Sequence, residues 1–316
     1  MALAINLLVQ VEVFAILAIS FNLLLGYAGL FSISQAVFYG LGAYTAGIVA
    51  TQYGVNLFIG MLAGVILTGI VGAVVGAATV RVSDEFLVVV TLGLQVITSG
   101  VFSNLGITGG SVGLPGIPLF SLGPLVIQPN WQFVVMGAIF LALIAAIAWR
   151  IGHSTLGLVL RALRDDQVAT LAVGKDTDTA KLLVFIISAM MAAVAGALWA
   201  GFGSFVSPDM FNLATSVLIF TMVVVGGTGS IVGSILGAAI LVGIPELETF
   251  LPLPIGAGAF LQQVLYAMLV LLFLVLRPQG ILGRRAAVMR APLAEEETAA
   301  PAAEASVSPT AMRRGA

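Results

Sequence analysis

The chain alternates long apolar stretches with short breaks that are polar, charged or rich in Gly and Pro. The apolar stretches run over residues 7–25, 30–51, 56–80, 86–105, 131–150, 180–202, 213–226, 231–245 and 259–276. One membrane crossing needs about 20 apolar residues, and a backbone in lipid must satisfy its own hydrogen bonds. The pattern therefore predicts an all-α, polytopic helical membrane protein whose helices include short or broken ones.

Basic residues gather in some breaks and are absent from others. Arginines and lysines occur in the connection around 150–181 and after the last stretch, namely Arg150, Arg161, Arg164, Lys175, Lys181, Arg277, Arg284, Arg285 and Arg290. The connections 106–130, 203–212 and 246–258 contain none. Because Lys and Arg favour the cytoplasmic side of a membrane, we expect the first group of connections inside the cell and the second group outside.

The region 213–245 allows two interpretations. Two short passes that turn at the glycine-rich residues 226–230 would keep Arg150 and Arg277 on the same side, whereas one long tilted helix would place the C-terminus outside. The two-pass interpretation agrees with the basic residues. It gives about nine crossings, in a range of eight to ten, with the N-terminus outside.

Two domains of unequal character follow from this pattern. Residues 1–285 are expected to form the membrane-spanning domain. Residues 286–316 are rich in Ala, Glu, Pro and Ser, so this segment lacks the apolar residues for a core and is predicted to be a disordered cytoplasmic tail. The segments 26–43 and 226–238 are loosely alike, which hints at an internal repeat.

The composition excludes several classes of function. The chain is 60% hydrophobic and 8% charged, with no cysteine and one histidine, so we expect neither a disulfide nor a metal site. Glu12 is the lone acid of the first four stretches and is expected near a helix end, which argues against a proton relay. No phosphate-binding G-x-x-x-x-G-K-[ST] motif is present. We therefore predict no enzyme, no ATPase site on this chain and no nucleic-acid partner.

The cytoplasmic connection 151–180 is the best candidate for contact with an energy-supplying partner. Residues 160–169 are expected to form a short helix that ends at Gly174, since glycine tolerates the left-handed backbone of a helix end. A solvated helix held by local Arg–Asp pairs is the alternative for this segment.

Motifs along the chain resemble the branched-chain amino acid ABC permeases, of the LivM type. They are Asn22–Gly29, Ser32, Ser34–Ala36, Gly40–Tyr44, Thr91–Leu92, Thr108–Gly110, Ser154–Gly157, Ala162–Ala169, Ala172–Gly174, Gly226–Ser230 and Arg277–Gly283. Each motif is weak alone, but their joint order is specific. Departures from the family pattern are Leu158, Gln167, Thr170 and Leu171, together with Gln95 and Val96, which stand where an acid is frequent.

The resemblance implies an assembly in a bacterial or archaeal cytoplasmic membrane. Its other members would be a homologous second permease, two cytoplasmic ABC ATPases that carry ATP and Mg, and an extracytoplasmic solute-binding protein. Within 151–180 the resemblance assigns the ATPase-coupling residues to Gly157, Arg161, Ala162, Arg164, Asp165, Asp166, Gln167, Ala169 and Gly174. The outer loop residues Thr108, Gly109 and Gly110 are expected to face the binding protein.

Neutral polar residues are the candidates for the substrate pathway. They are Ser32, Ser34, Gln35, Tyr44, Thr91, Gln95 and Thr98. An uncharged lining suits a zwitterion that must pass without being held, although hydrogen bonding between helices is the alternative role for each of these residues.

The resemblance and the pathway together predict a permease subunit of an ATP-driven importer for branched-chain or other hydrophobic amino acids. An importer of urea or short amides remains an alternative within the same class. A self-sufficient facilitator or channel for a small neutral solute is the alternative from another class.

Overall fold

The computed structural model describes residues 2–79, 84–122, 125–128, 130–248, 268 and 281–282. The chain divides into one compact unit, Met1–Arg284, and a second segment, Arg285–Ala316. The predicted cytoplasmic tail 286–316 lies outside the described residues. So does nearly all of the last apolar stretch, 259–276.

Helices make up almost all of the described chain. The first, α1 (Ala2–Asn22), continues into a π-helical turn, η1 (Leu23–Tyr27). The others are α2 (Gln35–Tyr53), α3 (Leu57–Thr79), α4 (Asp84–Asn104), α5 (Trp131–His153), α6 (Thr155–Asp165), α7 (Gln167–Ala172), α8 (Thr177–Gly203), α9 (Leu213–Gly226) and α10 (Ile231–Glu248).

Five of these helices are long and apolar enough to cross a membrane, namely Leu3–Tyr27, Leu57–Ala78, Phe86–Asn104, Trp131–His153 and Thr177–Gly203. Shorter apolar helices occupy Leu213–Gly226 and Ile231–Gly243. The chain is thus a polytopic helical membrane protein, as the hydrophobic pattern predicts.

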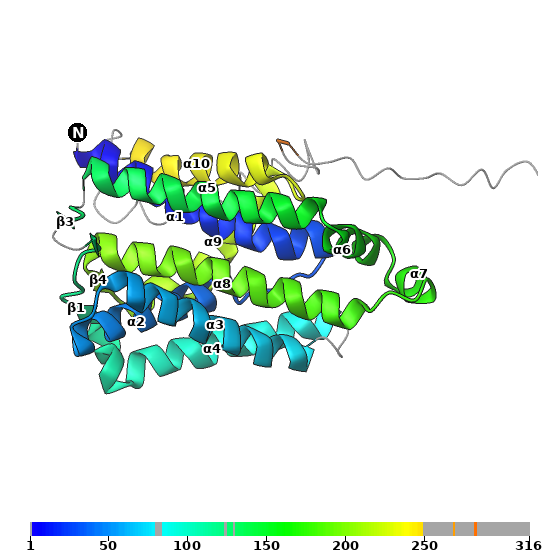
Figure 1. Cartoon of the computed structure of the whole chain (residues 1–316), viewed down its shortest axis with the longest axis horizontal. Helices are drawn as coiled ribbons and strands as arrows, with labels where there is room; N and C mark the ends of the chain where they lie inside the picture. Colours follow the sequence, from blue (N-terminus) through cyan, green and yellow to red (C-terminus); the bar gives the residue numbers. More distant parts are fainter. Residues whose placement is uncertain are drawn as a thin grey trace, which may run out of the picture. The chain divides into compact units, whose positions relative to one another are not determined.

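The helices run between two ends of this unit (Figure 1). One end carries α6 and α7 and is called the α6 end. The opposite end carries short strands and is called the β1 end. There β1 (Leu114–Pro115) pairs with β4 (Phe205–Val206), and β2 (Ser121–Leu122) pairs with β3 (Leu125–Val126), both antiparallel.

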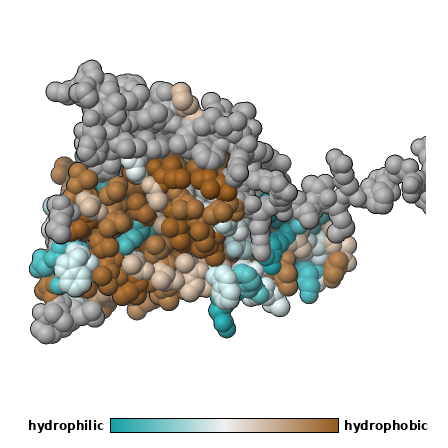
Figure 2. Space-filling view, turned by 90° about the horizontal axis from the view of Figure 1, so that it is seen from above, coloured by the Kyte–Doolittle hydropathy of each residue, from teal (hydrophilic) through white to brown (hydrophobic). Residues whose placement is uncertain are grey.

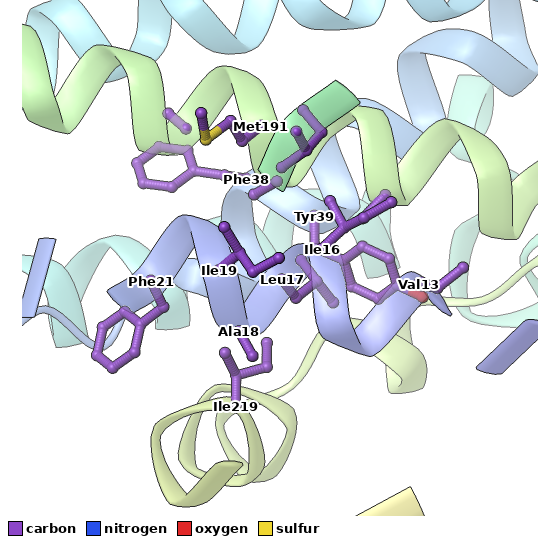
Figure 3. Close-up of a cluster of buried hydrophobic side chains, with 14 of the residues drawn as sticks. Val13, Ile16, Leu17, Ala18, Ile19, Phe21, Phe38, Tyr39, Met191 and Ile219 are labelled. Atoms are coloured by element: carbon purple, nitrogen blue, oxygen red, sulfur yellow. The ribbon is translucent and has the colours of Figure 1, made fainter. Parts of the chain in front are cut away.

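Helix α1 lies at the centre of the hydrophobic core. It packs against α5, α8, α9 and α10. Figure 3 shows α1 side chains such as Ile16 and Leu17 among Phe38 of α2, Met191 of α8 and Ile219 of α9. All of these side chains are buried. A helix that is apolar on every face is suited to this central position, because it meets other helices rather than lipid on most sides.

Close approaches of helices depend on small residues. A Cβ atom on Gly237 of α10 would lie 3.0 Å from the backbone nitrogen of Gly226 and closer still to the carbonyl oxygen of Met222, both in α9. Glycines of α3 meet α8 in the same way, with an ideal Cβ of Gly72 only 2.9 Å from that of Ala189. Small residues at membrane-helix interfaces permit such packing.

The region 213–245 forms two helices. α9 ends at Gly226, α10 begins at Ile231, and the two run antiparallel because Gly226 faces Gly233 while Met222 faces Gly237. The structure therefore agrees with the two-pass interpretation and excludes the single long helix.

A second break differs from the sequence prediction. The apolar stretch 30–51 was expected to be helical throughout, but α2 begins only at Gln35. Residues 29–34 are non-helical, and Gly29 has a φ of 74°. This positive φ ends the helical path after the π-turn, so hydrophobicity alone overestimated the helix by several residues.

The outer surface of the unit fits a lipid environment. Figure 2 shows a broad hydrophobic surface over the middle, with hydrophilic residues toward the α6 end. Exposed apolar side chains include Leu62 and Val74 of α3, Val96 of α4 and Ile139 of α5, each more than half exposed. In water such a surface would aggregate, whereas lipid solvates it.

Candidate functional site

The non-helical segment before α2 is held by hydroxyl groups. Ser32 and Ser34 share a hydrogen bond of 2.8 Å between their Oγ atoms. The backbone nitrogen of Ile33 donates to Oγ1 of Thr91, in α4, over 3.1 Å. Because an unsatisfied backbone group inside a membrane is costly, these bonds allow the segment to remain unwound. Ser32, Ser34 and Thr91, predicted as pathway residues, are thus brought together.

A second chain of hydrogen bonds joins α4, α9 and the start of α2. Gln95 donates through Nε2 to the carbonyl oxygen of Phe211, over 2.6 Å. Ser216 donates to Oε1 of Gln95 over 3.3 Å, and accepts from the backbone nitrogen of Ala36 over 3.1 Å. Sequence reasoning missed Ser216 and Phe211. The polar start of the stretch 213–226, after the Pro-containing connection, was the signal that could have found them.

Gln35 lies in a neighbouring polar contact between α1 and α2. Its Nε2 donates to Oγ of Ser20 over 2.5 Å, and Ser188 of α8 donates to the carbonyl oxygen of Ser20 over 2.7 Å. The Oε1 atom of Gln35 is buried without a hydrogen-bond partner among the described residues. One acceptor therefore remains available beside the two hydrogen-bonded groups.

Tyr44 belongs to an aromatic cluster toward the β1 end. Its ring centroid lies 4.4 Å from that of Phe102 and 5.7 Å from that of Phe211. Phe211 also meets Tyr39 at 4.9 Å. The hydroxyl of Tyr44 is buried without a hydrogen-bond partner in the described part of the chain. Thr98 follows Gln95 by three residues on α4, so the two side chains share a face of that helix.

All seven residues predicted for the pathway are buried. They come from the segment before α2, from α2 itself and from the middle of α4. Their hydrogen-bonding groups are neutral, and the unsatisfied oxygens of Gln35 and Tyr44 are the kind of groups that a polar solute can bond. None of the seven side chains itself carries a fixed charge.

Glu12 is placed differently from the sequence prediction. α1 begins at Ala2 rather than near residue 7, so Glu12 lies about 13 Å along the Leu3–Tyr27 span and nearer its middle than its end. The side chain is buried against Gly137 of α5, and its Oε2 has no hydrogen-bond partner among the described residues. No cluster of three or more metal-ligating residues occurs in the described chain.

The connection 151–180 forms two helices instead of one. α6 ends at Asp165 because Asp166 adopts an extended backbone, with φ −159° and ψ 110°. Asp166 then caps α7, as its Oδ1 accepts from the backbone nitrogens of Val168 and Ala169 over 2.8 and 3.0 Å. An aspartate before a helix stabilises its unpaired N–H groups. Gly174 has a φ of 74° and follows the end of α7 closely, as expected.

Three of the nine predicted coupling residues face their own chain. Arg164 donates through Nη1 to the carbonyl oxygen of Gly26, over 2.5 Å. Gln167 accepts through Oε1 from Nζ of Lys181, over 2.9 Å. Gly157 is buried where α6 meets the last residues of α5. These contacts fix α6 and α7 to the membrane helices, while Arg164 also keeps an exposed surface.

The outer side of α6 and α7 is open. Among the predicted coupling residues, Arg161 is half-buried and the exposed ones are Ala162, Arg164, Asp165, Asp166, Ala169 and Gly174. Large apolar side chains lie among them, with Val168 and Val173 each 76% exposed and Leu171 50% exposed. Exposed apolar residues rimmed by charges are typical of a protein-docking surface.

The three loop residues predicted to face a binding protein, Thr108, Gly109 and Gly110, also differ in exposure. Thr108 is buried, and its Oγ1 donates to the carbonyl oxygens of Phe102 and Leu105, over 2.7 Å each. Gly109 is exposed and Gly110 is half-buried, and their φ values are 80° and 61°. Thr108 therefore stabilises the turn, and the two glycines form it, so a partner would meet Gly109 before Thr108.

Fold and site together define a class of protein: a polytopic helical membrane protein with buried neutral polar residues around Gln95 and an exposed helical connection at one end. The family model described as the permease component of the branched-chain amino acid transport system matches residues 3–276. No solved structure matches the chain.

Relatives agree with this family. The branched-chain amino acid permease LivM of Salmonella typhimurium is 28% identical over 303 residues, covering 88% of this chain and 70% of the relative. The branched-chain amino acid permease LivH of Escherichia coli is 30% identical over 296 residues, covering 86% of this chain and 91% of the relative. The ribose import permease RbsC of Escherichia coli is 26% identical over 288 residues, covering 84% of this chain and 83% of the relative. The chain belongs to the family of branched-chain amino acid transport permeases.

Proposed function

We propose that this chain is the permease subunit of an ATP-driven importer for branched-chain or other hydrophobic amino acids in a bacterial or archaeal cytoplasmic membrane. Its relatives LivM and LivH are permeases for branched-chain amino acids. The uncharged hydrogen-bonding interior around Gln95 and Ser216 is the observation that carries the proposal, because it suits a zwitterion with an apolar side chain.

The energy would come from partner subunits. Two cytoplasmic ATPases that bind ATP and Mg would dock on the exposed side of α6 and α7, where Val168, Leu171 and Val173 are available. A homologous second permease would complete the membrane pathway. An extracytoplasmic binding protein would deliver the solute at the β1 end, near Gly109 and Gly110. The chain itself would carry no ATPase site.

Alternating access would then depend on the broken segments. Residues 29–34 and the connection before α9 both border the buried polar residues, and each has a hydrogen bond with a side chain of α4. Non-helical backbone at membrane depth is tolerated where it lines a pathway. Motion of the ATPases would be transmitted through α6 and α7 to these segments.

The experiment that tests this function is a transport assay with the assembled complex. The chain is co-expressed with its partner subunits, purified, placed in liposomes and supplied with the cognate binding protein. We expect leucine, isoleucine or valine to stimulate ATP hydrolysis and to accumulate only when ATP is present. Urea and ribose serve as competing solutes, since stimulation by urea alone would support the short-amide alternative.

A separate arm addresses the facilitator alternative. The chain alone is placed in liposomes without nucleotide, and solute entry is followed. Entry at the rate of the full complex would contradict the proposal, because a subunit that depends on ATPases should be closed without them.

A further inference from the structure

Four segments that are distant in sequence meet at the α6 end. They are the π-helical turn after α1, the break between α9 and α10, the side chain of Arg164, and residues 281–282. Each helix end leaves backbone groups without partners inside its own helix. At this place, called the α6 junction, several of these backbone groups obtain a hydrogen-bond partner from a different segment.

Asn22 provides the contacts of the break between α9 and α10. Its Oδ1 accepts from the backbone nitrogen of Gly229 over 2.8 Å. Its Nδ2 donates to the carbonyl oxygen of Ser230 over 2.9 Å and to Oγ of Ser234 over 2.8 Å. The side chain is buried, and both hydrogens of its amide are used. A single residue of α1 thus holds the turn that separates two membrane helices.

The last carbonyl groups of α9 are bonded by the segment that follows the final apolar stretch. Ile281 donates to the carbonyl oxygen of Val225, and Leu282 donates to that of Gly226, each over 3.0 Å. These bonds fix the C-terminal end of α9. The carbonyl of Gly26, at the end of the π-turn, is a further position at the junction.

Arg164 occupies that position. Its guanidinium donates to the oxygen of Gly26 and lies 3.7 Å from the place of a Cβ atom on Gly229. The ends of α1 and α9 both present carbonyl groups here, so the positive charge also compensates two helix dipoles. Gly26 must lack a side chain, because a Cβ atom would collide with Asn22 and with the backbone of Gly229.

The junction continues directly into both broken segments. Gly26 leads through Gly29 into the stretch that carries Ser32 and Ser34. The break at 227–230 terminates α9, which carries Ser216. A shift of α6 therefore changes the support of two segments that border the buried polar residues, and it does so without contact to a solute.

We propose that Arg164 and Asn22 are positioning residues that transmit the movement of α6 to the two breaks. This inference rests on the proposed function. When α6 moves, the Gly26 carbonyl loses its partner, and the π-turn and the 227–230 turn are released together. When α6 returns, both breaks are fixed again.

The test uses the full transporter and four variants. Arg164→Ala removes the hydrogen bond to the Gly26 carbonyl, and Arg164→Lys retains a donor there. Asn22→Ala removes the side chain that bonds the 227–230 break. Arg150→Ala is the matched control, because Arg150 is an exposed arginine of α5 near the same end. ATP hydrolysis, solute uptake and co-purification of the ATPase are measured for each.

A label reports the movement itself. The chain contains no cysteine, so Thr228→Cys, which is only partly buried in the break, gives a single reactive thiol. We expect its labelling rate to change when a nucleotide analogue closes the ATPases. In the Arg164→Ala background this change should vanish, while the ATPase still co-purifies.

We expect Arg164→Ala and Asn22→Ala to retain most ATP hydrolysis and to lose uptake by about tenfold or more, with Arg164→Lys between the two and Arg150→Ala unchanged. Uptake equal to the control in Arg164→Ala would overturn the inference. Parallel loss of hydrolysis, uptake and ATPase binding would overturn it too, because Arg164 would then be a docking residue, while the proposed function would stand. A wild-type complex without ATP-dependent uptake would overturn both.

Discussion

The side chain of Gln95 in α4 donates a hydrogen bond of 2.6 Å to the backbone carbonyl of Phe211, which lies in the connection between α8 and α9. Phe211 is buried among Tyr39, Tyr44 and Phe102. The bond therefore fixes the short 3-10 helix η4 (Pro208–Phe211) to α4 and holds its aromatic side chain beside the buried polar residues.

Replacing Gln95 by Ala should leave the Phe211 carbonyl buried without a partner, at a cost of about 1–3 kcal/mol. We expect solute uptake by the assembled transporter to fall by about tenfold, since 1.4 kcal/mol corresponds to a factor of ten. Asn104→Ala is the control on the same helix, because Asn104 is exposed and bonds only its own helix. Equal uptake in both variants would show that this bond does not position the segment.

A methyl group at Gly237 should separate α9 from α10. Its Cβ would meet the backbone of Met222 and Gly226, so Gly237→Ala is expected to destabilise the purified protein by about 1–3 kcal/mol. Gly243 lies on the same helix, and no heavy atom of the described chain comes within 4 Å of a Cβ built there. Thermal unfolding in detergent should therefore show a lower midpoint for Gly237→Ala than for Gly243→Ala. The reverse order would contradict the packing of this hairpin.

A charge on the exposed side of α7 should weaken ATPase binding without affecting membrane insertion. Val168→Asp introduces a carboxylate among Leu171 and Val173, and burying an unpaired charge at an interface is costly. Val112→Asp is the control, since Val112 is also 76% exposed but lies near the β1 end. Co-purification of the ATPase should drop for the first variant alone. Retained ATPase in Val168→Asp would remove α7 from the docking surface.

Asp176 caps the N-terminal end of α8, and its carboxylate makes the stability of this end depend on pH. Its pKa is lowered from the ordinary value of 3.8, chiefly because its carboxylate accepts a hydrogen bond from the Thr179 hydroxyl and another from the Thr179 backbone nitrogen. A folded pKa below the unfolded one means that the stabilisation is complete above about pH 4 and is lost as the pH falls through the folded pKa.

Thermal unfolding between pH 7 and pH 3 checks this dependence. The midpoint difference between the wild type and Asp176→Ala should be largest near neutral pH and should shrink toward pH 3. Asp178→Ala, which changes a neighbouring exposed carboxylate, is the control. A difference between wild type and Asp176→Ala that stays constant down to pH 3 would contradict a role for the ionised carboxylate.

The hydrophobic pattern predicted the class of fold because lipid imposes one rule on every crossing segment. Long apolar stretches must be helices, and the glycine-rich residues 226–230 offered a place for the turn that the structure shows between α9 and α10. The unwound segment before α2 was not visible in this pattern, because residues 29–34 are mostly apolar or small. Their departure from a helix depends on the φ of Gly29 and on Thr91, which is distant in sequence.

The candidate site could be predicted only in part, for a related reason. Type and spacing of residues indicated that Gln95 and Ser32 are polar groups inside the membrane, and both are buried. The partners of these groups, Phe211 and Ser216, depend on tertiary packing. The bond between Arg164 and the Gly26 carbonyl also depends on it, because the two residues are distant in sequence. The role of each pathway residue stays a prediction.

The proposed function requires that α6 and α7 lie in the cytoplasm, where they would receive the movement of an ATPase. Single cysteines at Val168 and at Val112, in a chain without native cysteine, test it through a membrane-impermeant thiol reagent. We predict that in intact cells the reagent labels Val168→Cys only after permeabilisation, whereas Val112→Cys reacts at once. Labelling of Val168→Cys from outside intact cells would contradict the account.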